Sequence, residues 1–235
     1  LAIRSATTVT ADLMDAAENL KVVGRAGIGV DNVDVDAATQ RGVVVMNTPF
    51  GNSVTTAEHA IAMMMSLARQ LPAANASTHA GKWEKSAFMG MELASKTLGL
   101  VGCGNIGSIV VDRAQGLKMR VIVYDPFLSP EHATDIGVEK VELDDLLGRA
   151  DFISLHTPLT DATRDIINAE AIAKMKTGVR IINCARGGLL VEADVLAGLE
   201  AGTVAGVALD VFAEEPATEN ILFGHPGVVA TPHLG

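Results

Sequence analysis

Short apolar runs separated by helix-like segments recur along the whole chain, and this alternation constrains the fold more than any other feature. Several runs are apolar without alternation, as expected for strands covered on both faces. Repeated strand–helix–strand units predict a parallel sheet with helices on both sides. The predicted strands are residues 21–24, 43–47, 97–102, 120–125, 151–156, 179–184, 204–211 and 228–231. The predicted helices are residues 10–19, 34–41, 55–70, 105–116, 143–149, 168–176 and 191–201.

The composition fits an α/β protein and excludes several other classes. Of the 235 residues, 49% are apolar but only 3% are aromatic, so the core must be mainly aliphatic. The net charge of −10 argues against a nucleic-acid partner, because phosphate contacts need clustered Lys and Arg. No apolar stretch reaches the ~18 residues of a membrane helix, so no membrane partner is expected. With two cysteines and no leader-like start, the chain is expected to be cytoplasmic.

The chain is expected to form a small N-terminal piece and a larger doubly wound domain, with a boundary near Pro49. Residues 1–3 read like the inside of a strand, and the chain stops at Gly235 without a visible terminator. These two ends predict a chain cut from a longer protein.

The predicted helix at residues 55–70 begins with a capping box formed by Thr55 and Glu58. Its apolar residues cover nearly the whole circumference, which predicts a helix buried on all sides. The pattern alone leaves two interpretations open, a central core helix and a subunit interface.

The segment Gly102-Cys103-Gly104-Asn105-Ile106-Gly107 is a GxGxxG sequence between a predicted strand and a predicted helix. Here Gly102 permits a tight turn, Gly104 lets the backbone approach a pyrophosphate, and Gly107 allows close helix–strand packing. The helix N-terminus offers N–H groups and partial positive charge to phosphates. The next strand ends in Asp125, 18 residues beyond Gly107, whose carboxylate can bond both ribose hydroxyls and would repel a 2′-phosphate. The motif therefore predicts a Rossmann-type site for NAD rather than NADP.

Three further predicted strands are followed by polar residues suited to acid/base chemistry. Their ends read Asn183-Cys184-Ala185-Arg186, Asp210-Val211-Phe212-Ala213-Glu214-Glu215 and Thr231-Pro232-His233. Each residue alone is more often an ordinary surface group, but α/β sheets bind ligands at the carboxyl ends of their strands. Arg186 would hold a carboxylate or carbonyl, His233 would exchange a hydroxyl proton, and Glu215 would orient the imidazole. The set predicts hydride transfer involving a 2-hydroxy or 2-keto acid, and no metal-site spacing is evident.

With these motifs, the chain resembles the D-isomer-specific 2-hydroxyacid dehydrogenases over essentially all of its length. Besides the GxGxxG sequence, the matching segments are residues 3–7, 23–27, 29–32, 47–49, 51–53, 156–158, 183–187, 210–212 and 231–233. The resemblance implies a Rossmann-type, doubly wound NAD-binding domain at residues 49–235. It implies part of a flavodoxin-like α/β substrate-binding domain at residues 1–48. It also implies a homodimer or higher homo-oligomer, which we expect to form through the helix at residues 55–70.

The same resemblance implies roles for individual residues. The catalytic set would be Arg186, Glu215 and His233. The residues expected to bind NAD are Gly102, Gly104, Asn105, Ile106, Gly107, Asp125, Thr157, Cys184 and Asp210, the last at the nicotinamide carboxamide. The residues expected to bind substrate are Arg4, Arg25, Gly27 and Asn52. Two arginines suit a phosphate dianion, which needs charge-assisted donors. His156 is expected to be structural, without a role in proton transfer.

Among the members of this family, the resemblance favours oxidation of D-3-phosphoglycerate to 3-phosphohydroxypyruvate, the first step of serine synthesis. One alternative is a glyoxylate, hydroxypyruvate or other D-2-hydroxyacid reductase. A second alternative, from another class, is a non-catalytic NAD-binding protein like the co-repressors of this family. Turnover with phosphoglycerate, turnover with another acid, and NAD binding without turnover would distinguish the three.

Overall fold

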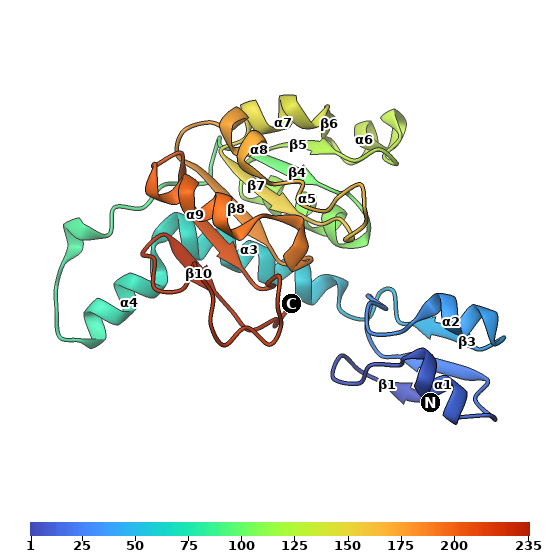
Figure 1. Cartoon of the computed structure of the whole chain (residues 1–235). Coiled ribbons are helices and arrows are strands. Elements are labelled where there is room, and N and C mark those ends of the chain that lie inside the picture. The colour runs from blue at the N-terminus through green and yellow to red at the C-terminus, as the bar shows by residue number, and fades with distance from the viewer. The chain divides into compact units, whose positions relative to one another are not determined.

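A computed structural model describes all residues, Leu1–Gly235, and the chain divides into two compact units, Leu1–Ser53 and Val54–Gly235 (Figure 1). The division lies slightly beyond the predicted boundary after residue 48. The connecting residues belong to the small unit because they bond back to it: the Thr48 N–H donates to the Gly27 carbonyl at 3.1 Å. The assignment of the small unit to substrate binding stays a prediction.

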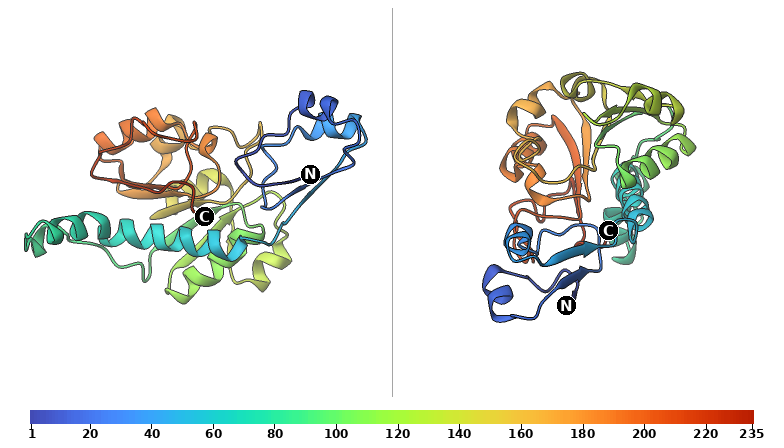
Figure 2. Two further views of the ribbon diagram at one scale, coloured as in Figure 1. Left: turned by 90° about the horizontal axis from the view of Figure 1, so that it is seen from below. Right: turned by 90° about the vertical axis from the view of Figure 1, so that its right-hand side faces the viewer.

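The larger unit is built on a seven-stranded parallel sheet in the order β10-β9-β8-β7-β4-β5-β6, and Figure 2 shows helices on both of its faces. Successive strands run outward from β4 in one direction and then resume on its other side at β7. This reversal marks the switch point of a doubly wound sheet and confirms the predicted fold class. The strands are β4 (Thr97–Val101), β5 (Arg120–Tyr124), β6 (Glu139–Lys140), β7 (Phe152–Leu155), β8 (Val179–Asn183), β9 (Val204–Leu209) and β10 (Val228–Ala230).

The helices of this unit agree with the sequence pattern except at two places. The helices α4 and α6 lie outside all the predicted helix ranges, and the pattern of α6 is only six residues long. None of the helices is long and apolar enough to cross a membrane. The helices are α3 (Ser53–Arg69), α4 (Leu71–His79), α5 (Asn105–Gly116), α6 (Pro130–Asp135), α7 (Leu143–Arg149), α8 (Ala169–Lys174) and α9 (Glu192–Glu200), with short 3₁₀ turns η1 (Lys85–Ala87) and η2 (Gly187–Leu189).

The core of the larger unit is aliphatic, as the composition predicts. Two clusters of buried side chains pack on the sheet, one involving α3 and α5 and the other involving α7, α8 and α9. Phe152 is the single aromatic side chain among the largest fully buried ones. Burial of aliphatic surface is the main force holding such a body together.

The helix α3 is not buried on all sides, so that expectation is wrong. Its inner face lies in the core through residues that include Ala57, Met64 and Leu67. Its outer face leaves Val54 51% exposed, and Glu58 and Ala62 are exposed as well. The helix therefore combines an apolar core face with an exposed outer face of mixed character, which includes Val54, Ala62 and the charged Glu58.

The small unit is a three-stranded parallel sheet in the order β1-β2-β3. Its elements are β1 (Ala2–Ile3), α1 (Ala11–Ala16), β2 (Val22–Arg25), α2 (Val35–Gln40) and β3 (Val44–Asn47). Buried residues of the helices and strands, among them Met14, Val23 and Ala38, form one cluster. Neighbouring residues in a strand point to opposite faces, and the alternate positions Val44 and Met46 are exposed.

Candidate active site

The carboxyl edge of the large sheet brings together most of the residues that the sequence singles out. His233 follows β10, Glu215 follows β9 and Arg186 follows β8, and these three strands are neighbours in the sheet. Thr157 follows β7, the glycine motif follows β4, and Asp125 follows β5. Because all the strands are parallel, an acid/base group and a nucleotide-binding motif share one edge.

His233 and Glu215 form a direct pair at this edge. The Nδ1 atom of His233 lies 2.6 Å from Oε2 of Glu215. The other carboxylate oxygen, Oε1, accepts a hydrogen bond from the Phe212 N–H at 3.0 Å. This backbone contact fixes the carboxylate, and the carboxylate in turn fixes the imidazole. The Nε2 atom of His233 is left as the ring position for proton exchange, and the side chain is 47% exposed.

Arg186 is positioned by the turn between β8 and η2. Asn183, fully buried at the end of β8, donates from Nδ2 to the Arg186 carbonyl at 2.8 Å, which holds the turn. The next residue, Gly187, lies directly against the β9 loop: a Cβ there would be 1.8 Å from the Phe212 carbonyl oxygen. Close packing of these two backbones therefore sets the Arg186 loop against the loop that leads to Glu215.

Asp210 anchors the segment that carries His233, a role that the sequence reasoning missed. The carboxylate is fully buried, and its Oδ1 accepts from the Thr231 hydroxyl at 2.6 Å and the Leu234 N–H at 2.8 Å. Its Oδ2 accepts from the Gly235 N–H at 2.8 Å. A hydroxyl two residues before His233 was the one sequence signal for this anchor. The predicted contact of Asp210 with a nicotinamide carboxamide stays a prediction.

The glycine motif has the geometry that a dinucleotide site requires. Gly102 has a φ of +91°, and a Cβ there would be 2.6 Å from the His156 carbonyl oxygen. A Cβ at Gly107 would be 2.4 Å from the Gly102 carbonyl oxygen, so α5 packs tightly on the end of β4. At Gly104, the N-cap of α5, a Cβ would meet nothing within 4 Å and no side chain caps the helix. This open N-terminus fits the pyrophosphate of NAD.

Asp125 is held in place beside this motif. Its Oδ2 accepts from the Cys103 N–H at 2.7 Å, and its Oδ1 accepts from the Phe127 N–H at 2.8 Å. The carboxylate is thereby fixed at the first turn of the GxGxxG sequence, with acceptor capacity left for hydroxyl donors. This placement suits the predicted ribose contact.

The buried thiols and the second imidazole of this edge are unsuited to proton transfer. Burial raises the pKa of Cys103 to about 11 and that of Cys184 still further, so both remain thiols. Burial lowers the pKa of His156 to about 4, and Nε2 of this neutral ring lies 2.8 Å from the Ser154 hydroxyl. Cys184, His59 and Asp210 each bring one potential metal ligand within 4.8 Å of the others. The protonated thiol and the occupied carboxylate suit hydrogen bonding rather than a metal.

The small unit holds the predicted substrate residues at the carboxyl edge of its own sheet. Arg4 follows β1 and Arg25 ends β2, on neighbouring strands. The Arg25 side chain lies over Gly27, where a Cβ would be 1.4 Å from Nη1, and its Nε is buried without a hydrogen-bond partner. Asn52 lies beyond β3, just before α3. Their roles toward a substrate stay predictions.

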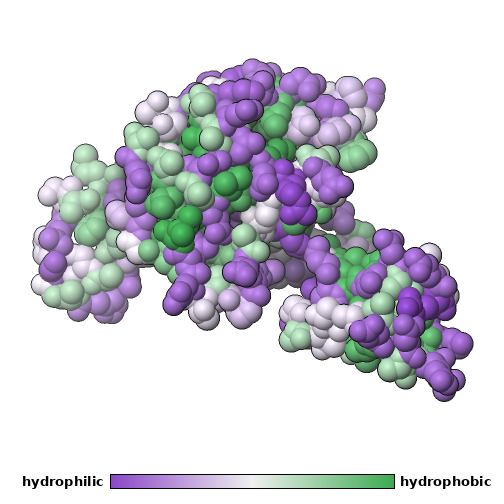
Figure 3. All heavy atoms as spheres, in the orientation of Figure 1, coloured by the Kyte–Doolittle hydropathy of each residue, from purple (hydrophilic) through white to green (hydrophobic).

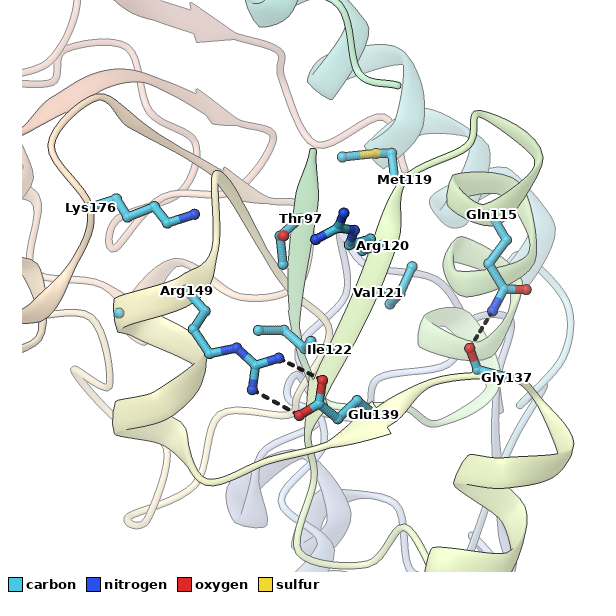
Figure 4. A pocket seen from close by; sticks show the side chains of 11 residues that line it. Thr97, Gln115, Met119, Arg120, Val121, Ile122, Gly137, Glu139, Arg149 and Lys176 are labelled. Carbon is cyan, nitrogen blue, oxygen red and sulfur yellow. Dashed lines mark hydrogen bonds and ion pairs between the residues drawn. The ribbon is translucent and has the colours of Figure 1, made fainter. Parts of the chain in front are cut away.

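A groove at the opposite, amino end of the large sheet is lined by three cations, Arg120, Arg149 and Lys176, and the last two are paired with carboxylates (Figure 4). Arg149 pairs with Glu139 at 2.5 Å and with Asp145 at 2.6 Å. Lys176 pairs with Asp151 at 3.1 Å. Ion pairs therefore occupy much of this groove, whereas the residues predicted for catalysis lie at the carboxyl edge.

Comparisons with known proteins identify relatives that are dehydrogenases or reductases of hydroxy and keto acids. Residues 61–235 match the family model of the D-isomer specific 2-hydroxyacid dehydrogenase, NAD binding domain. D-3-phosphoglycerate dehydrogenase of Bacillus subtilis is 54% identical over the whole chain, which covers 45% of that protein. A glyoxylate reductase from Paecilomyes thermophila is 36% identical with a TM-score of 0.90, covering 100% of this chain and 74% of that one. D-lactate dehydrogenase from Aquifex aeolicus, complexed with NAD and lactic acid, is 29% identical with a TM-score of 0.89, covering 99% and 74%.

The chain spans less than half the length of the curated relatives it matches. The family model nonetheless covers most of the chain, including the glycine motif and all three strand ends of the acid/base group. The chain therefore belongs to the D-isomer specific 2-hydroxyacid dehydrogenases, and its larger unit contains their NAD-binding domain.

Proposed function

We propose that the protein is an NAD-dependent dehydrogenase that oxidises D-3-phosphoglycerate to 3-phosphohydroxypyruvate, the first step of serine biosynthesis. The 2.6 Å pair of His233 and Glu215, at the same sheet edge as the GxGxxG motif, carries the proposal for the reaction. Relatives support the choice of substrate, since identity to a phosphoglycerate dehydrogenase is 54% and to a glyoxylate reductase 36%.

In this mechanism the residues of the chain orient the substrate and move its proton. Bound NAD supplies the hydride acceptor. Nε2 of His233 removes the hydroxyl proton as the hydride leaves C2, and Glu215 stabilises the resulting imidazolium through Nδ1. Arg186 binds the carboxylate or the developing carbonyl oxygen. Arg4 and Arg25 supply positive charge for the phosphate. Because the net charge of the chain is −10, an anionic substrate needs such local positive charge in order to bind.

The proposal is tested by incubating the natural protein with NAD and D-3-phosphoglycerate, together with a reagent that traps the keto acid. NADH should accumulate, and D-glycerate, which lacks the phosphate, should react far more slowly. NADH-dependent reduction of glyoxylate or hydroxypyruvate without phosphoglycerate turnover would instead indicate a sister reductase. NAD binding without turnover of any acid would indicate the non-catalytic alternative.

Asp125→Ala should reduce the preference for NAD over NADP by at least about tenfold, because a bond to a charged group is lost and the repulsion of a 2′-phosphate disappears. The measurement is the ratio of kcat/KM for the two coenzymes. Asp135→Ala removes an exposed carboxylate of α6 and should leave the ratio unchanged. An unchanged ratio in Asp125→Ala would refute the ribose contact.

We further propose a homodimer formed through the outer face of α3 and the arm of residues 71–91 that follows it. Figure 3 shows apolar residues among polar ones on this arm, at the left. The helix α4 buries none of its residues, and the arm exposes Trp83 by 89% and Met89 by 79%. A nine-residue helix that buries none of its residues has only marginal stability in water. We therefore expect a second chain to pack against it.

Light scattering after size exclusion should give the mass of two chains, and Trp83→Glu should shift the mass toward one. Ile221→Glu, an equally polar change at another exposed apolar residue, should leave the dimer intact. A monomeric natural protein, or a dimer unaffected by Trp83→Glu, would count against this interface.

A further inference from the structure

His59, on α3, lies beside the Asp210 anchor, although nothing in its sequence context assigns it a role. Its Nε2 lies 3.1 Å from the Thr231 hydroxyl oxygen and 3.2 Å from Oδ1 of Asp210. The side chain is only 18% exposed. These contacts join α3 to the chain segment that bears the proposed acid/base residue.

The direction of these hydrogen bonds follows from the donors available. The Thr231 hydroxyl donates its single proton to Asp210 at 2.6 Å, so its oxygen can only accept from the ring. Asp210 is also an acceptor. The Nε2 atom of His59 must therefore carry the hydrogen, which it directs at the two oxygens together.

Further packing places α3 firmly against this segment. Met63 lies one turn along the same face of the helix, with its sulfur 3.8 Å from the Thr231 hydroxyl oxygen. A Cβ at Gly235 would be 3.5 Å from Cδ2 of His59 and 3.4 Å from Cγ2 of Thr56. The His59 ring thus fills the space between the helix and the anchored segment.

The segment needs such support because His233 has an unfavourable backbone. Its φ is +54°, in the left-handed region that side chains other than glycine rarely adopt. The conformation is held from both sides: Thr231 precedes His233, the N–H groups of Leu234 and Gly235 follow it, and all three donate to Asp210. A strained residue persists only where its surroundings determine its conformation.

We propose that His59 is a positioning residue for the proton-transfer step. It holds Thr231 and Asp210 in one arrangement, and these hold His233 in its left-handed conformation against Glu215. The proposal rests on the proposed function for its effect on turnover, but the anchoring itself is a property of the protein without ligands.

The test compares His59→Leu, which removes the donor, with His59→Gln, which keeps an N–H donor at a similar reach. Amide hydrogen exchange at Leu234 and Gly235 in the ligand-free protein should accelerate at least about tenfold in His59→Leu and recover largely in His59→Gln. In the natural enzyme, kcat should fall about tenfold or more in His59→Leu with little change in KM for substrate. His132→Leu, at an exposed histidine of α6, should change neither quantity.

A cycle with Thr231→Val separates positioning from general stability. If His59 acts through Thr231, the double variant should be scarcely worse than the more affected single variant, whereas independent effects would multiply. Unchanged exchange in His59→Leu, or a His59→Gln variant as impaired as His59→Leu in both readouts, would overturn the proposal. If the natural protein turns over no hydroxy acid, the proposed function fails, and the exchange measurement still decides the role of His59.

Discussion

Replacing His233 with Asn should lower turnover by about 10²–10⁴-fold while leaving the affinity for NAD almost unchanged. Asparagine can still reach toward Glu215, but it has no basic nitrogen to take the hydroxyl proton. The glycine motif and Asp125 follow other strands, β4 and β5, so the substitution leaves them intact. The measurements are kcat with the proposed substrate and the dissociation constant of NAD by titration.

A matched variant shows whether the effect is specific to the site. His132→Asn makes the same change at an exposed histidine of α6. This helix connects β5 to β6, at the opposite end of the sheet from β10, so kcat should stay within the error of the wild type. Turnover that survives within a few-fold in His233→Asn would show that another group exchanges the proton. His156 is a poor substitute, because burial lowers its pKa to about 4 and its Nε2 is engaged by Ser154.

Much of the fold is predictable because its signals are local. Continuous apolar runs indicate buried parallel strands, and the strands β4, β5, β7, β8 and β9 occur within the predicted ranges. The glycine motif specifies a strand–turn–helix unit by sterics alone. In the structure, Gly102 and Gly107 lie too close to neighbouring backbone to carry a side chain. The helix α4 escaped prediction because it buries no residue, so no apolar periodicity marks it.

The pairing of Glu215 with His233 could be proposed from sequence because both residues follow predicted strands. A carboxylate and an imidazole suit a single acid/base site, which suggested that the two strands are neighbours. In the sheet, β9 and β10 are indeed adjacent. The anchor at Asp210 was hard to predict, because two of its donors are the backbone N–H groups of Leu234 and Gly235, and every residue except proline carries such a group. His59 was equally hidden, since its contact with Thr231 spans 172 residues of sequence.

Gly187→Ala should destabilise the larger unit and disturb the site at once. The added Cβ would lie 1.8 Å from the carbonyl oxygen of Phe212 and 2.5 Å from the backbone nitrogen of Ala213, so one loop must move. Overpacking of this kind costs about 1–3 kcal/mol or more, and each kcal/mol lowers Tm by roughly 2–4 °C in a protein of this size. Because the displaced loops carry Arg186 and Glu215, kcat should fall by as much as ~10²-fold.

Gly116→Ala is the matched control for this substitution. A Cβ at Gly116, the last residue of α5, would meet nothing within 4 Å, and alanine favours the helix. Its Tm should therefore stay the same or rise slightly, with kcat unchanged, whereas Gly187→Ala should lose both stability and turnover. A Gly187→Ala variant as stable and active as Gly116→Ala would mean that the two loops can separate freely. In that case the close approach of the Arg186 turn to the Phe212 backbone could not be what positions the catalytic set.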